Sequence, residues 1–250
     1  MIENKRIIVT GGSSGMGAAL VTGYSKAGAK VVSMDINAID GETIAAEAGA
    51  SFVCCDVSDE VSVKSSIAAA TELLGGIDVL VHAAGISPTT DPEEMSVALF
   101  EKVMTVNMTG TMLLNREIFA HFQDKGGKII NFASGMGVLG APKKAHYAAS
   151  KGAVIAWTRS LASAWGKYGI TVNAIAPAIW TPMYEATRAQ MTAEELKAHE
   201  ADQARKRPLK GRLGDVEKDF LPFMTFLASD GAGFLTGQLY KIDGGGLMLS

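Results

Sequence analysis

Three polar residues in the middle of the chain, Ser134, Tyr147 and Lys151, have the types and the spacing that proton transfer needs. Tyr147 and Lys151 are four positions apart, so in a helix they share one face and the ammonium group can stand close to the phenol. A free tyrosine has a pKa near 10, and a neighbouring cation stabilises the phenolate and lowers that pKa. Tyr147 would then serve as a general base toward an alcohol and as a general acid in the reverse reaction. The hydroxyl of Ser134 would hold the substrate oxygen and stabilise developing charge.

Taken singly, each of these residues is more typical of a structural role. A serine often caps a loop, a tyrosine often anchors a half-buried surface, and a helix lysine is usually solvated. The combination, and the position of Ser134 at the carboxyl end of a predicted parallel strand where ligands of such folds collect, is what indicates catalysis.

The N-terminal segment 6–17, Arg-Ile-Ile-Val-Thr-Gly-Gly-Ser-Ser-Gly-Met-Gly, reads as a buried strand, a glycine-rich turn and the start of a helix. Glycines let the backbone come close to phosphates, and the free N–H groups and dipole of a new helix favour negative charge. A glycine cluster alone also suits any tight strand-to-helix turn. The segment therefore predicts a pyrophosphate site made by Gly11, Ser13, Ser14, Gly15, Met16 and Gly17.

Asp35 ends the second predicted strand, about 20 residues beyond this turn, where a carboxylate can accept hydrogen bonds from the adenosine ribose. The same charge would repel a 2′-phosphate, and the nearby Ser14, Met34 and Ile36 offer no cation to attract one. These residues favour NAD over NADP, although Asp35 could also be a simple turn former. The pair Asp56-Val57 would meet the adenine.

Short β-branched runs alternate with helical patterns along the whole chain, which predicts a doubly wound α/β Rossmann fold with a parallel sheet of about seven strands and helices on both faces. Helices are expected to start near Gly15, Gly41, Glu60, Ser96, Tyr147 and Asp215. The expected strands are 6–10, 30–35, 51–55, 78–83, 127–134, 171–176 and 238–242.

The 250 residues are expected to form a single dinucleotide-binding catalytic domain. Segment 181–212 breaks the alternation, because it is charged and helix-prone and no strand intervenes before the last long helix. Its position predicts an insertion over the edge of the sheet that serves as a substrate lid, with a solvated surface excursion as the alternative.

Several ordered landmarks of this chain resemble the short-chain dehydrogenase/reductase family, in particular its NAD-preferring members. Thr10 to Gly17 reads T-G-x-x-x-G-x-G, and Ser134 is followed by the Y-x-x-x-K of Tyr147 and Lys151. The resemblance extends over essentially the whole chain and includes Asn107, Asp56-Val57 and the closing Ile242-Asp243-Gly244-Gly245.

The resemblance implies a role for each of four polar residues. Tyr147 would be the general acid/base, and Ser134 would position the substrate oxygen. Lys151 would lower the tyrosine pKa and bind the nicotinamide ribose, and Asn107, at a helix irregularity, would support a proton relay through the lysine. Further cofactor contacts are expected from Tyr147 and Lys151 themselves and from Ile36, Asp56, Val57, Ala84, Gly85, Pro177, Ile179 and Thr181.

The sequence departs from the family pattern at two places. Where the family has an N-N-A-G-like motif, this chain has His82-Ala83-Ala84-Gly85, and we expect a structural role for His82. Where the family has proline-glycine after the sixth strand, the chain has Pro177-Ala178, which could stiffen or reshape the nicotinamide end of the site.

The residues expected to face the substrate are mostly apolar, which favours a hydrophobic or cyclic secondary alcohol or ketone over a small polyol or a phosphorylated sugar. The same side chains could instead pack the lid onto the body. They are Ser134, Met136, Tyr147, Trp180, Met183 and Tyr184, with Ile86, Ser87, Gly135 and Gly137 close by.

Composition limits the partners. A net charge of -3 provides no broad positive field for nucleic acid or an anionic membrane, and no apolar run approaches the roughly 18 residues of a membrane helix. The adjacent Cys54 and Cys55 suit a reducing, cytoplasmic compartment, and the four histidines lack the spacing of a metal site. Small residues on the helices of 96–122 and 147–167 permit close helix approach, and the family resemblance implies that these helices pair across a two-fold axis, so we expect a homotetramer, with a dimer next.

Two rival functions remain open at this point. An NADPH-dependent carbonyl or 3-ketoacyl reductase would need a cation near Ser14 or Ile36 and would normally lack an acid at Asp35. A dinucleotide-binding regulator without catalysis would not need the set of Ser134, Tyr147, Lys151 and Asn107.

Overall fold

The computed structural model describes residues 1–248, apart from the side chains of Met183 and Thr187. In this part of the chain a seven-stranded parallel sheet has the order β3-β2-β1-β4-β5-β6-β7, which confirms the predicted fold class. The strands are β1 (Arg6–Thr10), β2 (Lys30–Asp35), β3 (Ser51–Cys54), β4 (Val79–His82), β5 (Gly127–Phe132), β6 (Ile170–Pro177) and β7 (Leu239–Ile242).

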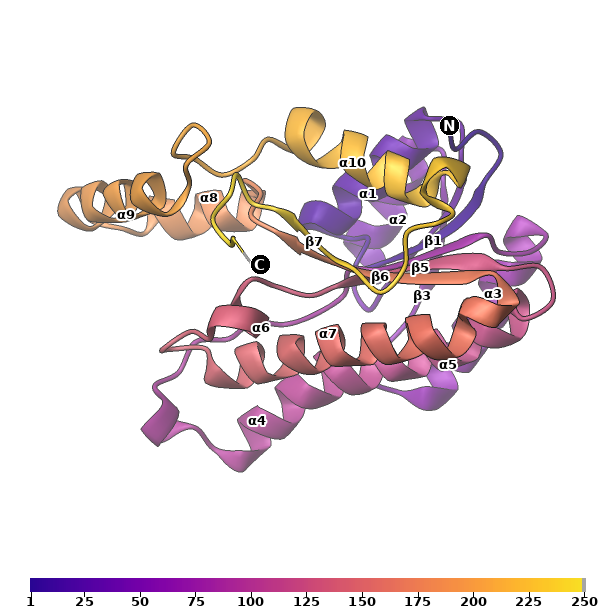
Figure 1. The fold of residues 1–250 in the computed structure, drawn as a ribbon, viewed down its shortest axis with the longest axis horizontal. Coiled ribbons are helices and arrows are strands. Elements are labelled where there is room, and N and C mark those ends of the chain that lie inside the picture. The colour runs from indigo at the N-terminus through magenta and orange to yellow at the C-terminus, as the bar shows by residue number, and fades with distance from the viewer. Residues whose placement is uncertain (249–250) are drawn as a thin grey trace.

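Helices cover both faces of the sheet, because strands that are buried on both sides need two apolar layers (Figure 1). One layer holds α1 (Gly15–Lys26), α2 (Ala38–Ala48) and α10 (Leu221–Ala228). The other holds α3 (Glu60–Leu74), α4 (Val97–Met104), α5 (Gly110–Phe122) and α7 (Ala145–Trp165). The remaining elements are α6 (Met136–Leu139), α8 (Pro182–Ala189), α9 (Ala193–Lys206), η1 (Pro92–Glu94), η2 (Thr105–Thr109), η3 (Gly166–Tyr168), η4 (Val216–Phe220) and η5 (Asp230–Ala232).

Side-chain caps explain where the helices begin. Asn37 accepts a hydrogen bond from the N–H of Asp40, so α2 starts three residues before the predicted Gly41. Ser96 caps α4 in the same way, and Asp215 caps η4. The long helix begins at Ala145, two residues before the predicted start at Tyr147.

Several predicted strands end too late. The third, fourth and fifth strands were expected to reach Cys55, Ala83 and Ser134, but the ladder stops at Cys54, His82 and Phe132. One further backbone hydrogen bond follows each strand, from the N–H groups of Cys55, Ala83 and Ala133, and these residues already line a cleft. Ser134 therefore lies two residues beyond its strand.

The segment predicted as an insertion forms two helices, α8 and α9, that project beyond one end of the sheet (Figure 1). Its return to the body is fixed by a parallel bridge between Ile179 and Gly214. No helix in the described part of the chain has both the length and the apolar character needed to cross a membrane.

Candidate active site

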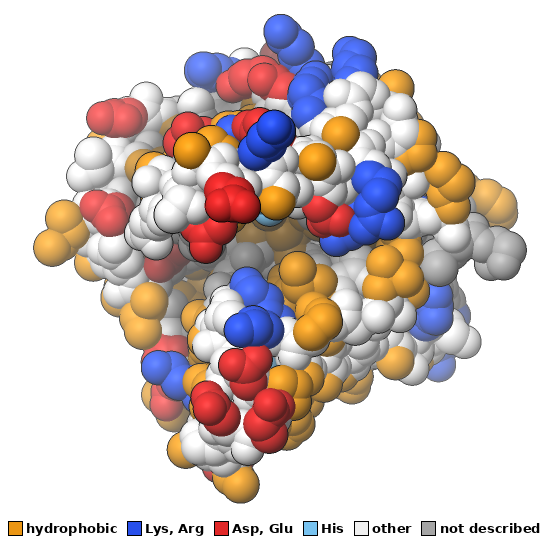
Figure 2. Space-filling model, turned by 90° about the vertical axis from the view of Figure 1, so that its left-hand side faces the viewer, with side chains coloured by type: hydrophobic (Ala, Val, Ile, Leu, Met, Phe, Trp, Pro, Cys, Tyr) orange, Lys and Arg blue, Asp and Glu red, His pale blue; other side chains and the backbone are white. Residues whose placement is uncertain are grey.

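A cleft of about 590 Å³ runs along the carboxyl ends of the strands. The space-filling view in Figure 2 faces the end of the molecule that carries α9 and α4, and this face is hollowed between them. All residues predicted to bind the cofactor line the cleft except Ile179, which is buried in the core. They are Gly11, Ser13, Ser14, Gly15, Met16, Gly17, Asp35, Ile36, Asp56, Val57, Ala84, Gly85, Tyr147, Lys151, Pro177 and Thr181.

The turn between β1 and α1 has the close packing that only glycine permits. Gly11 has a φ of 71°, and a Cβ atom there would lie 2.7 Å from the backbone nitrogen of Ala84. A Cβ at Gly17 would overlap the carbonyl oxygen of Gly11. The backbone and the N-terminus of α1 consequently form an open cradle that fits a pyrophosphate.

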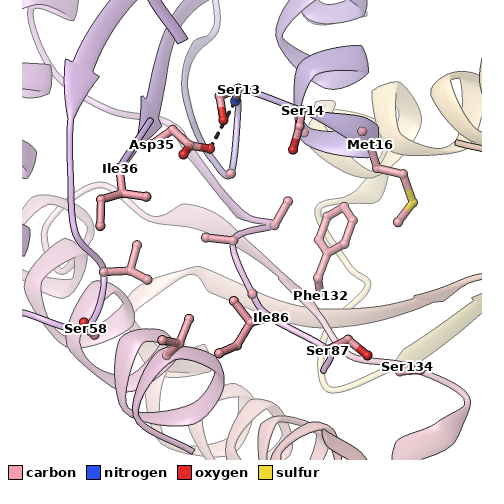
Figure 3. A pocket seen from close by; sticks show the side chains of 18 of the residues that line it. Ser13, Ser14, Met16, Asp35, Ile36, Ser58, Ile86, Ser87, Phe132 and Ser134 are labelled. Atoms are coloured by element: carbon pink, nitrogen blue, oxygen red, sulfur yellow. Dashed lines mark hydrogen bonds between the residues drawn. The ribbon is translucent and has the colours of Figure 1, made fainter. Parts of the chain in front are cut away.

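Asp35 stands at one end of the cleft with its carboxylate fixed by backbone groups. Oδ2 accepts a hydrogen bond of 3.1 Å from the N–H of Ser13, and Oδ1 accepts one of 3.0 Å from Asn37 (Figure 3). Each oxygen keeps a further lone pair for a ribose hydroxyl. The cations that line the cleft are Lys102 and Lys151, and neither belongs to the turns that follow β1 and β2. The residues thus fit an adenosine ribose without a 2′-phosphate.

Ser134, Tyr147 and Lys151 come together at the other end of the cleft. Tyr147 and Lys151 are one turn apart on α7, and the ammonium nitrogen lies 5.8 Å from the centre of the tyrosine ring. Lys151 is 4% exposed and donates a hydrogen bond of 2.6 Å to the carbonyl of Phe132. The Oγ of Ser134 accepts a hydrogen bond from the N–H of Met136, so its own proton remains available to a substrate oxygen.

The pKa of Tyr147 differs from the expectation. Burial raises the pKa of the Tyr147 phenol above its usual value, and the nearby Ser134 hydroxyl acts in the opposite direction. Burial also lowers the pKa of Lys151 to about 8. The direction of the shift in the Tyr147 pKa is therefore opposite to the expected lowering, because desolvation of the phenol outweighs the effect of the Ser134 hydroxyl.

Asn107 sits in the π-helical turn η2, between α4 and α5, as the family resemblance implied. Its side-chain Oδ1 accepts from the N–H of Ile86 at 2.8 Å, and its Nδ2 donates to the carbonyl of Ile86 at 2.9 Å and to Ser150 at 3.0 Å. A Cβ on Gly85 would lie 3.0 Å from Oδ1 of Asn107 and 3.4 Å from Nζ of Lys151. The wide turn thus fixes one carboxamide beneath the loop that follows β4.

His82 replaces the family asparagine and is 2% exposed. Its Nδ1 shares a hydrogen bond of 2.7 Å with the hydroxyl of Thr10 on the neighbouring strand, and that hydroxyl also accepts from the N–H of Ala84. Burial, with the charge of Lys151, lowers the pKa of His82 to about 3. These contacts favour the structural role that the sequence suggested.

The lowered pKa of His82 makes a prediction about acid stability. Unfolded histidine titrates near 6.5 and the folded residue near 3, so the unfolded chain binds more protons below pH 6.5. Stability is therefore lost as pH falls from 6.5 toward 3, by about 2 kcal/mol between pH 7 and pH 5. Urea unfolding at both pH values should show a smaller loss for His82→Asn.

The control for this prediction is His121→Asn, which removes a partly exposed histidine from α5. This variant should keep the pH dependence of the wild type. An equal loss of stability in the wild type and in His82→Asn would contradict the assignment.

The second departure, Pro177-Ala178, is accommodated without strain. Ala178 does not adopt a left-handed φ, and its N–H donates to the carbonyl of Ile242 at 2.9 Å. Its carbonyl accepts from the N–H of Gly214 at 2.9 Å. The alanine is part of a backbone junction between the sheet and the chain returning from α9.

Only some of the residues predicted to contact the substrate line the cleft. Ser134 and Tyr147 line the cleft, whereas Met136, Trp180 and Tyr184 do not. The side chain of Met183 lies outside the described residues.

Contacts between α8 and α9 explain where Trp180 and Tyr184 are held. The guanidinium of Arg188 lies 4.6 Å from the Trp180 ring centre and pairs with Glu200 at 2.5 Å, while the hydroxyl of Tyr184 is 2.8 Å from Nε2 of His199. Tyr184 therefore packs within the segment 181–212, and Trp180 packs against it.

Some residues of the cleft were missed in the sequence analysis. Phe132 and Ala133 directly precede Ser134, and Cys55 and Ser58 flank Asp56-Val57, so proximity to motifs could have indicated them. Ala83 directly precedes Ala84, and Val106 directly precedes Asn107, whereas Lys102 adjoins no motif. The missed residues are Cys55, Ser58, Ala83, Lys102, Val106, Phe132 and Ala133.

Comparison with known proteins identifies the family to which the chain belongs. A family model described as Enoyl-(Acyl carrier protein) reductase matches residues 11–246. The chain belongs to the short-chain dehydrogenase/reductase family. Members of this family use nicotinamide dinucleotide cofactors, and the protein is an oxidoreductase of this kind.

Individual members of the family match nearly the whole chain. L-fucose dehydrogenase of Bos taurus is 35% identical over 244 residues, which cover 96% of this chain and 88% of that protein. The 2,5-dichloro-2,5-cyclohexadiene-1,4-diol dehydrogenase of Sphingobium indicum is 35% identical, with 98% and 97% covered. The crystal structure of levodione reductase has a TM-score of 0.89 at 32% identity and covers 98% of both chains.

Proposed function

We propose that this short-chain dehydrogenase/reductase is an NAD-dependent dehydrogenase that interconverts a hydrophobic or cyclic secondary alcohol and its ketone. The observation that carries the proposal is the arrangement of Tyr147 and Lys151, one helical turn apart at the end of the cleft opposite Asp35. Asp35 supports NAD because its charge opposes a 2′-phosphate.

In the proposed oxidation, the substrate hydroxyl accepts a hydrogen bond from Ser134 and gives its proton to the oxygen of Tyr147. A bound NAD would supply the hydride acceptor. The Lys151 ammonium group, held by the Phe132 carbonyl, would stabilise the tyrosine oxygen and hold the nicotinamide ribose. Asn107 positions the loop at Gly85 and Ile86 and supports proton exchange through the lysine.

The segment 181–212 is proposed to close over the substrate as part of a single catalytic domain. The support is its position at the mouth of the cleft, since Thr181 lines the cleft and α8 follows directly. Closure would bring the apolar side chains of this segment toward Ser134 and exclude water.

The nature of the substrate is supported by the apolar surroundings and by one relative. Ile86, Phe132 and Ala133 line the cleft around Ser134. The relative from Sphingobium indicum acts, by its name, on a cyclic diol. We further propose a homotetramer in the cytoplasm, with a dimer as the alternative assembly.

The test is a panel of cyclic and open-chain secondary alcohols, followed by the absorbance of NADH. We expect turnover with NAD on cyclic alcohols at rates well above those with NADP. A preference for NADP would instead support the carbonyl or 3-ketoacyl reductase. Tight NADH binding without turnover on any alcohol or ketone would support a non-catalytic dinucleotide-binding regulator.

A further inference from the structure

A second cavity, of about 350 Å³, lies outside the cofactor cleft, where three stretches of chain meet. Its walls are the connection 209–214 between α9 and η4, the residues Lys218 and Asp219 of η4, and residues 241–244 at the end of β7. This volume is within the range of small-molecule sites in proteins.

The side chains around this cavity carry an excess of positive charge. Four cations, Lys210, Arg212, Lys218 and Lys241, stand against two acids, Asp219 and Asp243. The residues that line the cavity therefore carry a net charge of +2, although the whole chain carries a net charge of -3. Such a concave positive surface concentrates small anions.

Both acids are already engaged by other groups. Asp243 accepts hydrogen bonds from the N–H groups of Gly245 at 3.0 Å and Leu247 at 2.7 Å. Asp219 accepts one from the N–H of Asp215 at 2.8 Å and pairs with Arg212 at 3.4 Å.

Within residues 1–248, the three lysines Lys210, Lys218 and Lys241 form no direct ion pairs. The N–H of Asp215 and, to a smaller extent, the charge of Lys210 nevertheless contribute to lowering the pKa of Asp219. Lys210 also has a φ of 61°, a left-handed conformation that residues other than glycine rarely adopt, in the turn that walls the cavity.

The cavity adjoins the base of the segment 181–212. The N–H of Leu209 donates to the carbonyl of Gly244 at 3.0 Å, and the N–H of Trp180 donates to the carbonyl of Gly214 at 2.8 Å. A ligand that bridges the three walls would therefore hold the returning chain against the end of β7.

We propose that this cavity binds a small polyanion, a molecule with two or more carboxylate or phosphate groups, at a site separate from the cofactor cleft. Lys210, Lys218 and Lys241 provide the unpaired ammonium groups, and Arg212 provides a further cation. Binding crosslinks the connection 209–214 to η4 and β7. The site does not depend on the substrate or on catalysis.

The experiment is calorimetric titration of the protein with citrate and with inorganic pyrophosphate, each with and without saturating NADH. We expect both, or one, to bind when the cofactor cleft is filled, with affinity that falls as KCl is raised. The double variant Lys218→Met, Lys241→Met should weaken binding at least tenfold. The control double variant Lys26→Met, Lys64→Met removes two exposed, unpaired lysines elsewhere and should change affinity less than twofold.

Hydrogen exchange adds a readout that locates the ligand. Amides of 209–214 and 241–244 should exchange more slowly with citrate or pyrophosphate bound, and only in proteins that retain Lys218 and Lys241. The proposal is overturned if neither anion binds, if NADH abolishes binding, or if the two double variants lose affinity equally. Citrate binding without pyrophosphate binding would identify a polycarboxylate, and the reverse a phosphate compound.

Discussion

Replacing Tyr147 by phenylalanine is expected to lower kcat by about three orders of magnitude, while the affinity for NADH stays within about twofold. The variant removes only the phenol oxygen, so the substrate loses its proton acceptor and one of the two hydroxyls that orient its oxygen. The ring remains packed on α7 beside Lys151, 5.8 Å from the ammonium nitrogen, and the cofactor cradle is untouched. Steady-state rates and NADH fluorescence titration measure the two quantities separately.

The matched control is Tyr168→Phe, the same chemical change on η3, where the ring packs edge-on against Phe119 far from the cleft. This variant should keep wild-type kcat. A Tyr147→Phe enzyme that retains more than a tenth of wild-type turnover would contradict the proposed role of Tyr147 in proton transfer.

The second large effect concerns the choice of cofactor. The double variant Asp35→Ser, Ile36→Arg should lose about 10- to 100-fold in NADH affinity, because the hydrogen bonds of the ribose to a charged carboxylate disappear, which together contribute about 1.5–3 kcal/mol. The same variant should bind NADPH more tightly than the wild type, since a guanidinium now stands where a 2′-phosphate arrives. Fluorescence titration with both reduced cofactors gives the ratio.

Ile36→Arg alone is the informative control. Ile36 is 67% exposed, so the new side chain is tolerated, and Asp35 still repels the 2′-phosphate. This single variant should continue to prefer NADH. Tighter binding of NADPH than of NADH by the wild-type protein would show that Asp35 does not select the cofactor.

Much of the fold follows from local sequence. Strands buried on both faces appear as short β-branched runs, so β1 and β2 were predicted with the observed bounds. The ends of β4 and β5 were not, because the point where a strand ends depends on its pairing with neighbouring strands, which the local sequence does not report. The end of the cleft near Asp35 could also be predicted from the local sequence, because the glycines and Asp35 act through the geometry of the backbone next to them.

The substrate end was less predictable, since it depends on contacts between distant segments. Trp180 and Tyr184 are held by Arg188 and His199, and only the pairing of α8 with α9 brings these groups together. The pKa of Tyr147 depends on how much water the surrounding chain removes, which spacing alone does not report.

The π-helical turn at Asn107 lowers the stability of its helix and at the same time positions the Asn107 side chain. A regular α-helix would pair its backbone groups more favourably than the five-residue π-turn Thr105–Thr109 does. The additional residue rotates everything after it by about 100° relative to what precedes it, and this rotation delivers the carboxamide to Ile86 and Ser150. A substitution that restores regular α-helical pairing at this turn would therefore raise the stability of the helix and displace the Asn107 carboxamide from Ile86 and Ser150.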